Sequence, residues 1–327
     1  MAQATLELSV VVPVYGCAGC VEELHRRVMA ATEGIEGGVE LIFVDDRSPD
    51  GSWPKLRAIA EADPRVRAVR MSRNFGQHAA ITAGLMEARG RWIAVMDCDL
   101  QDPPEQIPLL YGRAREGHDI VFGRRRRRGA SPFRRIAART YFRLMNAFTN
   151  SNLQGDYGTF SVISHKVAQA YLALGERDRH YLFILNWLGF AHTEVEYEHG
   201  ERGHGESSYS FGRLVRHALD GVFFQTTVLL RWVVYLGFAI STLGILAAAY
   251  FAIANLTGAS YPGWTSLAVF TLTIGGFTIV STGITGLYIG KVFEQVKERP
   301  LFVVDERVGA PVEHTEREQE QERELAG

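Results

Sequence analysis

Short, almost wholly apolar runs alternate with segments of helical spacing over roughly the first 120 residues. Such runs are typical of strands that are buried on both faces of a parallel sheet. The predicted strands span residues 8–15, 39–44, 65–71, 91–96 and 119–123, and the predicted helices span residues 21–32, 53–61 and 79–88. This alternation predicts an α/β fold, with a mainly parallel, Rossmann-like sheet and right-handed crossovers.

A basic amphipathic helix is predicted over residues 131–149. Ser131 and Pro132 suit its N-cap and first helical position, and arginines occupy the face opposite an apolar stripe. Such a helix lies naturally on an anionic membrane surface, although an ordinary surface helix has the same pattern. Binding of nucleic acid is disfavoured, because no recognition module surrounds the arginine run at 124–128.

The next segments complete a cytosolic domain predicted over residues 1–210. An apolar segment at 159–164, an aromatic helix at 180–190 and an alternating edge strand at 192–198 lead to a polar loop at 202–209. Arginine, serine and glycine in that loop suit closure over phosphates, while a flexible linker is the alternative. The first residues lack the basic region of a signal peptide, so we expect this domain in the cytoplasm.

The chain has no charged side chain from Trp232 to Gly290, about 59 residues, which is enough for two crossings of about 20 to 25 residues each. An amphipathic juxtamembrane helix at 211–231 precedes predicted spans at about 232–255 and 267–290. Basic residues flank the pair but not the turn between them, which places both termini in the cytoplasm. Residues 291–327 form a cytosolic segment, predicted to be disordered after about residue 306. A buried hydrophobic hairpin is the alternative.

Three acids and an amide follow the strand at 91–96. They are Asp97, Asp99, Gln101 and Asp102, and two prolines then end the run. Ligands bind at the carboxyl ends of parallel strands, and adjacent aspartates repel each other unless a cation lies between them. Hard oxygen ligands suit Mg²⁺ or Mn²⁺. The alternative is a solvated turn, because aspartates are common in turns.

Several other classes are disfavoured. The first strand is not followed by G-x-G-x-x-G, which argues against a nicotinamide or flavin enzyme, and a P-loop motif is absent. Three cysteines do not make a disulfide framework. Cys17 and Cys20 form a lone C-x-x-C, for which a loop-to-helix turn is favoured over zinc or redox chemistry. The net charge of −2 adds little.

Together these segments resemble the polyprenyl-phosphate glycosyltransferases of glycosyltransferase family 2, the group of dolichol-phosphate mannose synthase and GtrB-like enzymes. The resembling segments, in order, are VVPVY (11–15), VDDRSPDGS (44–52), SRNFGQHAAITAG (72–84), MDCDLQDPPE (96–105), GDYGTFSVIS (155–164), ER (176–177), RGHGESSY (202–209) and YIGKVFEQVKERPLFVV (288–304). They cover nearly the whole chain apart from the tail. One departure is Gly16, where the family usually has asparagine, and it weakens only a local turn contact.

The resemblance implies a GT-A catalytic domain followed by a two-helix transmembrane hairpin, a nucleotide-sugar donor and a divalent cation. It implies donor contacts at Pro13, Tyr15, Asp45, Asp46, Arg73, Asp97 and Ser207, and metal ligation by Asp97, Asp99 and Gln101. Asp99, Asp156 and Arg202 are the implied catalytic residues. Arg124, Arg128, Arg135 and Arg139 are assigned to the acceptor phosphate and the membrane.

The expected reaction is inverting, metal-dependent transfer of a hexose from a UDP- or GDP-sugar to polyprenyl (undecaprenyl) phosphate at the cytoplasmic membrane. UDP-glucose is the expected donor, on family frequency alone, and the membrane oligomers of the family suggest a homotetramer. A soluble or polysaccharide acceptor remains an alternative. A processive synthase is disfavoured, because Gln225 and Arg231-Trp232 have the wrong spacing for Q-x-x-R-W. A non-catalytic scaffold is disfavoured by the intact acids.

Overall fold

The computed structural model describes residues 6–126, 157–177, 179–198, 228–256 and 263–309. The chain divides into two compact units. The first comprises residues 1–146, 151–208 and 298–327, and the second comprises residues 147–150 and 209–297. Each unit is described by itself.

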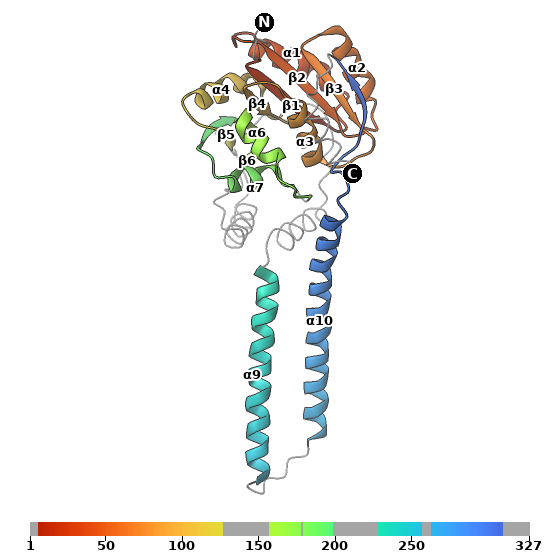
Figure 1. The fold of residues 1–327 in the computed structure, drawn as a ribbon, viewed down its shortest axis with the longest axis vertical. Coiled ribbons are helices and arrows are strands. Elements are labelled where there is room, and N and C mark those ends of the chain that lie inside the picture. Colours follow the sequence, from red (N-terminus) through yellow and green to blue (C-terminus); the bar gives the residue numbers. More distant parts are fainter. Residues whose placement is uncertain (1–5, 127–156, 178, 199–227, 257–262, 310–327) are drawn as a thin grey trace. The chain divides into compact units, whose positions relative to one another are not determined.

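The first unit contains one eight-stranded sheet, ordered β7-β5-β6-β4-β1-β2-β3-β8 (Figure 1). Its strands are β1 (Leu8–Val14), β2 (Val39–Asp45), β3 (Val66–Met71), β4 (Trp92–Val95), β5 (Ile120–Arg126), β6 (Tyr157–Ser164), β7 (His192–Glu198) and β8 (Val304–Val308). Strands β4, β1, β2 and β3 pair in parallel, as do β5 and β7. Strand β6 is antiparallel to both β4 and β5, and β8 is antiparallel to β3.

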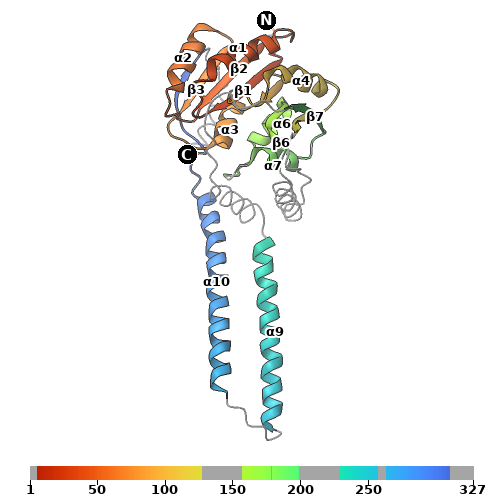
Figure 2. The same cartoon turned by 180° about the vertical axis from the view of Figure 1, so that it is seen from behind.

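Helices cover both faces of the sheet, as Figure 1 and the reverse view in Figure 2 show. On one face the core is formed with α1 (Val21–Thr32), α2 (Ser52–Ala62) and α4 (Ile107–Arg115), the last of which follows the short 3-10 helix η1 (Pro104–Gln106). On the other face it is formed with α3 (Gln77–Glu87), α6 (His165–Leu172) and α7 (Tyr181–Trp187). Successive β1 residues such as Val10 and Val11 enter opposite cores, as expected of a strand buried on both faces.

Small residues bring α3 close to the sheet. A Cβ atom on Gly84 would lie 2.2 Å from Cγ1 of Val11 and 3.3 Å from Cγ2 of Val44. Alanines at 79, 80 and 83 are buried on the same helix. The helix that begins at Gln77 is therefore held tightly above β1 and β2, which fixes the position of its N-terminal residues at the sheet edge.

The predicted α/β fold with a mostly parallel sheet is confirmed, with three differences. Strand β6 runs antiparallel within the sheet, and α4 and α6 were not predicted. The tail was expected to be disordered after about residue 306, but β8 continues to Val308 because it pairs with β3. Residues 310–327 lie outside the described residues, as does the predicted basic helix at 131–149.

The second unit contains two long helices, α9 (Val228–Leu256) and α10 (Trp264–Val296), which lie side by side in Figure 1 and Figure 2. A Cβ atom on Gly237 would lie 3.6 Å from the Phe277 ring, so the helices contact there. The predicted juxtamembrane helix spans residues 211–231, and its last residues, from Val228, belong to α9. Residues 211–227 lie outside the described residues.

One segment of the described residues, Thr273–Val296 of α10, is long and apolar enough to cross a membrane, with a mean hydropathy of 1.2. Helix α9 contains only a shorter apolar segment of this kind, Val233–Gly244. Among the described residues, therefore, the second of the two predicted spans overlaps a segment that is long and apolar enough to cross a membrane.

Candidate active site

Those predicted donor-binding residues that the structure describes lie at one edge of the sheet. Because β1, β2, β3 and β4 are parallel, their carboxyl ends share an edge. Tyr15 follows β1, Asp45 and Asp46 end β2, Arg73 follows β3, and the D-x-D motif of Asp97 and Asp99 follows β4. The antiparallel β6 begins at this edge and β5 ends there.

Side chains from two other elements hold the first D-x-D carboxylate. Asp97 Oδ1 accepts hydrogen bonds of 2.7 Å from Nε2 of Gln77, on α3, and 2.7 Å from Oγ1 of Thr159, on β6. Both donors fix one oxygen, so Asp97 is oriented before any ligand binds. Neither donor was predicted as a site residue.

The second D-x-D carboxylate lies in a tight turn. Asp99 Oδ1 accepts a 3.1 Å hydrogen bond from the backbone N–H of Gln101. Between them, Leu100 has φ +62°, a left-handed conformation that is unfavourable for a leucine. Backbone strain of this kind persists where the surrounding structure imposes it, and it is common in binding loops.

A third acid, Asp102, is fully buried behind the motif. Its Oδ2 lies 3.1 Å from a guanidinium nitrogen of Arg125, and the same nitrogen is 3.7 Å from Asp97 Oδ2. The Tyr197 hydroxyl donates a hydrogen bond to Asp102 Oδ1. Arg125 is therefore a shared counter-charge for two acids.

The charge balance of this cluster fits a divalent cation. Three acids, Asp97, Asp99 and Asp102, lie close together, and the Arg125 guanidinium pairs with two of them, Asp97 and Asp102. Burial raises the pKa of Asp97 to about 6, and the neighbouring Asp102 and Asp99 carboxylates add to the rise. An added cation would lower that pKa by favouring the charged form. Carboxylate oxygens are also suitable ligands for Mg²⁺ or Mn²⁺.

The protein would supply only some of the ligands of such a cation. Among the described residues, no three His, Cys, Asp or Glu side chains gather as a metal site. Mg²⁺ is usually held by one or two carboxylates together with substrate phosphates and water. The D-x-D pair fits this mode. The predicted ligation by Gln101 stays a prediction, because only its backbone N–H is placed in a contact.

The two acids at the end of β2 differ in their partners. Asp46 accepts backbone hydrogen bonds from Phe75 (2.7 Å) and Gly76 (2.9 Å), one on each oxygen, and so holds the loop that leads into α3. Asp45 is 0% exposed; its Oδ1 accepts the Ser48 N–H at 3.1 Å, and its Oδ2 is buried without a hydrogen-bond partner. Burial raises the pKa of both carboxyls. The buried Oδ2 of Asp45 lies 4.0 Å from Nε of Arg70.

The other described site residues are placed as follows. Pro13 is buried within β1, and Tyr15 is 54% exposed at the edge. Arg73 is exposed, with its guanidinium 4.5 Å from the centre of the Phe75 ring. Arg124, expected to bind the acceptor phosphate, lies 3.6 Å from both Glu194 and Glu196 on β7. Its neighbour Arg125, which was not predicted as a site residue, contacts Asp97 and Asp102.

The remaining predicted site residues lie outside the described residues. They are Asp156, Arg202, Ser207, Arg128, Arg135 and Arg139. Their roles stay predictions.

Several further contacts at this edge were not predicted. Asp305 of β8 lies 2.7 Å from Arg47 and 3.9 Å from Arg70, and Arg70 is 4.0 Å from Asp45. Cys17 and Cys98 form a disulfide, which was not predicted. Cys17 pairs with the cysteine between the D-x-D acids and not with Cys20 of its own C-x-x-C motif.

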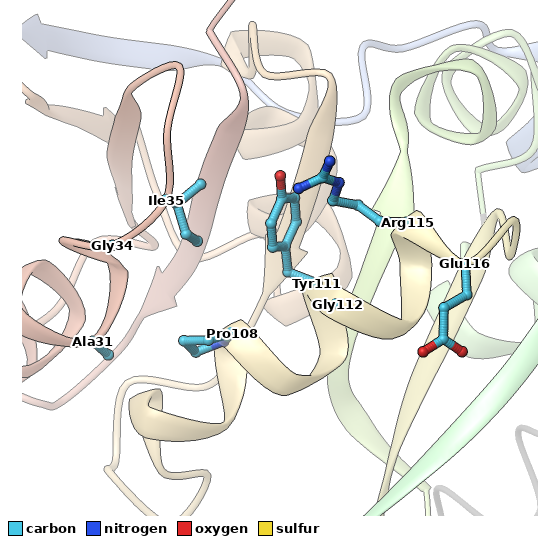
Figure 3. Close-up of a pocket in the computed structure, with 8 residues that line it drawn as sticks. All are labelled: Ala31, Gly34, Ile35, Pro108, Tyr111, Gly112, Arg115 and Glu116. Carbon is cyan, nitrogen blue, oxygen red and sulfur yellow. The ribbon is translucent and has the colours of Figure 1, made fainter.

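A surface hollow lies away from this edge. Figure 3 shows it between the end of α1 and α4, with Ile35, Pro108 and Tyr111 among its lining residues. The Tyr111 hydroxyl donates a 2.8 Å hydrogen bond to Glu7, which precedes β1. The hollow is therefore at the amino ends of the strands, opposite to the D-x-D edge, and is separate from the donor site.

A GT-A-like α/β sheet with D-x-D acids at its carboxyl edge defines a class, the glycosyltransferases. The family model described as "Glycosyl transferase family 2" matches residues 9–172. The chain belongs to this family, and it is a glycosyltransferase.

Relatives of known sequence match nearly the whole chain. The uncharacterised glycosyltransferase YkcC of Bacillus subtilis is 34% identical over 306 residues, covering 93% of this chain and 95% of YkcC. An undecaprenyl-phosphate 4-deoxy-4-formamido-L-arabinose transferase of Pseudomonas paraeruginosa is 36% identical over 310 residues, covering 93% and 91%. Among solved structures, the glucosyl-3-phosphoglycerate synthase of Mycobacterium tuberculosis in complex with Mn²⁺, UDP and glucosyl-3-phosphoglycerate aligns with a TM-score of 0.47 and 19% identity, covering 68% and 81%.

Proposed function

We propose that this glycosyltransferase transfers a hexose, with inversion, from a nucleotide sugar to undecaprenyl phosphate at the cytoplasmic face of a membrane. The observation that carries the proposal is the D-x-D cluster at the carboxyl edge, with Asp97 already oriented by Gln77 and Thr159. A relative whose name gives undecaprenyl phosphate as its substrate matches along 93% of this chain, which supports the acceptor.

Asp45 and the D-x-D pair are proposed to hold the nucleoside and the diphosphate of the donor, respectively. Asp45 ends β2 at the edge where the nucleoside would bind, and UDP-glucose is the proposed donor. Asp97 and Asp99 would hold Mg²⁺ or Mn²⁺, with Gln101 beside them. The cation, when bound, would neutralise charge on the leaving diphosphate. Arg125 would keep Asp97 ionised and in place.

The acceptor phosphate is proposed to attack the anomeric carbon from the face opposite the diphosphate. A phosphate monoester has its second pKa near ~6, so at pH 7 most of it is already a strong nucleophile. The reaction therefore needs little general-base catalysis. We propose that Asp156 acts mainly by positioning or electrostatics, and that Arg202 and Ser207 contact phosphates.

Both long helices are proposed to cross the membrane. Large apolar side chains are exposed along each of them, including Phe238, Leu243 and Leu246 of α9 and Ile279, Val280 and Ile289 of α10. Exposed apolar surface on this scale is unusual for a soluble domain and suits lipid. The catalytic unit and both termini would lie in the cytoplasm. A homo-oligomer, proposed as a tetramer, would place several catalytic units on one membrane patch.

The test is transfer of radiolabelled sugar into an organic extract. A panel of UDP- and GDP-sugars is supplied with undecaprenyl phosphate and Mg²⁺ or Mn²⁺, and Asp99→Ala and Glu105→Ala enzymes are compared. Glu105 is an exposed acid that pairs with Arg27, so its loss should change the rate by less than about twofold.

We expect lipid label from one donor that is lost with EDTA and in the Asp99→Ala enzyme. Absence of lipid label from every donor, with donor hydrolysis still metal-dependent, would contradict the acceptor and favour a soluble or polysaccharide acceptor.

A further inference from the structure

The three cysteines of the chain lie together beside the D-x-D motif. Cys17 follows β1, Cys20 is the N-cap of α1, and Cys98 lies between Asp97 and Asp99. They are 9%, 3% and 8% exposed, respectively, and belong to one core cluster. Cys17 and Cys98 are bonded across 81 residues of sequence, and Cys20 is a free thiol. The Cα atoms of the pair are 6.5 Å apart, within the range of natural disulfides.

We propose that the Cys17–Cys98 pair is a reversible oxidative modification site, and that the bond fixes the D-x-D loop in the form that binds donor nucleotide. Oxidation of the cysteine pair does not depend on the proposed function, whereas its effect on the binding of donor nucleotide rests on that function.

The bond completes a set of links between three strand-end loops. The loop after β1 is already tied to the loop after β2, because Gly16 N–H donates to Ser48 (3.3 Å) and Ala18 N–H donates to Asp50 (2.8 Å). The disulfide joins this pair of loops to the loop after β4. The loops that would surround the nucleoside and the diphosphate are then connected to one another.

The position of Cys98 decides what the bond can affect. Its side chain enters the core, while the side chains of Asp97 and Asp99 on either side are partly exposed at the edge. A bond to Cys98 therefore restrains the backbone of both acids and leaves their carboxylates available to a ligand. The strained Leu100 lies in the same turn, after Asp99, so release of the bond to Cys17 would allow this turn to relax. Ordering a loop before binding increases affinity, since less conformational entropy is lost on binding.

The chemistry is thiol–disulfide exchange with a small or protein disulfide as the oxidant. One cysteine thiolate attacks the external disulfide, forms a mixed disulfide and releases one thiol. The second cysteine attacks the mixed disulfide, forms Cys17–Cys98 and releases the other thiol. The two cysteines together lose two protons and two electrons, and the external disulfide is reduced to two thiols. A dithiol reverses the reaction. Disulfides in intracellular proteins are commonly transient and redox-sensing.

The experiment uses the full chain in detergent, oxidised with glutathione disulfide or reduced with dithiothreitol. Free thiols are alkylated and the peptides mapped by mass spectrometry. Binding of UDP or GDP with Mn²⁺ is then measured by calorimetry, together with the thermal midpoint. Cys17→Ala removes the bond without changing the D-x-D motif, and Cys20→Ala is the matched control, since it removes a thiol that is outside the bond.

We expect alkylation of Cys20 alone after oxidation and of all three cysteines after reduction. The oxidised form should bind nucleotide about fivefold more tightly and unfold at a higher temperature. Cys17→Ala should abolish both differences, and Cys20→Ala should retain them.

Failure to map a Cys17–Cys98 peptide, including its replacement by Cys17–Cys20, would overturn the proposal. So would equal or weaker nucleotide binding by the mapped oxidised form. A third outcome is that the bond and the thermal shift are found but no nucleotide binds in either redox state. The proposed coupling of the bond to donor binding is then overturned. The lack of nucleotide binding, which is measured separately from the bond, also contradicts the proposed function.

Discussion

Arg125 donates a 3.1 Å hydrogen bond to Asp102, an acid with no exposed surface. The pair lies directly behind the D-x-D motif, and the Tyr197 hydroxyl donates to the other carboxylate oxygen of Asp102. Three elements therefore meet at one buried carboxylate: the turn after β4, strand β5 and strand β7. The β5–β6 pairing shifts register between Phe122 and Arg124, and a shift of this kind changes the direction of nearby side chains.

Removing the Tyr197 hydroxyl should destabilise the catalytic unit. Tyr197→Phe takes one donor from a fully buried carboxylate, which should cost about 1–3 kcal/mol in the free energy of unfolding. Tyr111→Phe is the matched control, since its hydroxyl donates to the partly buried Glu7, and it should cost less than about 1 kcal/mol. Thermal unfolding of both variants measures the difference, and equal midpoints would contradict it.

The hydroxyl of Thr159 should matter for donor binding more than for stability. Thr159→Val removes one of the two donors that orient Asp97, and loss of a charge-assisted hydrogen bond of about 1.5 kcal/mol corresponds to about tenfold weaker UDP–Mn²⁺ binding. Calorimetric titration checks the affinity.

Thr32→Val is the control for Thr159→Val. Its buried hydroxyl donates to the Val28 carbonyl of its own helix, far along the chain from the D-x-D motif. Its nucleotide affinity should be unchanged. Similar losses of affinity in the two variants would show that the Thr159 effect is not specific to Asp97.

Much of the fold was predictable because it is encoded locally. The apolar runs of β1, β2 and β4 are typical of strands buried on both faces, and α1 has the predicted bounds, Val21–Thr32. Strand β8 was not predictable in this way. Its sequence, VDERV, is highly charged and resembles the tail that follows it, and it becomes a strand only by pairing with β3, more than 200 residues earlier.

In the candidate site, too, local features could be predicted and long-range contacts could not. The place of Asp45, Asp97 and Asp99 at the sheet edge could be predicted, because Asp45 and Asp97 directly follow predicted strands and Asp99 lies two residues beyond Asp97. Thr159 and Arg125 could not, since their contacts depend on β6 entering the sheet antiparallel between β4 and β5. The Cys17–Cys98 bond joins two loops that are adjacent only because β1 and β4 are neighbours, so local spacing could not predict it.

Two arginines that share one acid should differ strongly in their contribution to stability. Arg67 is 4% exposed and lies 2.7 Å from Glu40 and 3.1 Å from Glu87. Arg67→Met leaves two buried carboxylates without it, at a cost of about 3–5 kcal/mol. The Arg307 side chain is 47% exposed and lies 2.8 Å from Glu87, so Arg307→Met should cost at most about 1 kcal/mol.

Thermal unfolding distinguishes these two variants of the same Glu87 cluster. For a domain of this size about 1 kcal/mol corresponds to roughly 2–4 °C, so the Arg67→Met midpoint should fall by about 10 °C and the Arg307→Met midpoint by only a few degrees. A large shift for Arg307→Met would instead indicate that β8 is essential for the sheet edge.

Acidification should destabilise the catalytic unit through His180. Burial lowers the pKa of His180 to about 4, its Nδ1 is buried without a hydrogen-bond partner, and its ring packs 4.3 Å from Phe183 and 4.5 Å from His78. An unfolded histidine has a pKa of about 6.5, so between these values the unfolded state binds more protons than the folded state. Stability is therefore lost as the pH falls through this window, by about 2 kcal/mol at pH 5.

His180→Phe should reduce this loss, because phenylalanine keeps the ring contacts and does not titrate. The thermal midpoint is measured at pH 7.5 and pH 5 for the wild type, His180→Phe and His192→Phe, the last being an exposed histidine on β7. Asp45 and Asp46, whose pKa values are raised by burial, contribute a pH dependence of the opposite sign, but they are present in all three proteins and cancel in the comparison. An equal fall in midpoint for wild type and His180→Phe would show that His180 is not the group that titrates. A smaller fall in His180→Phe alone would assign the acid sensitivity to the contact between α7 and the N-terminal end of α3.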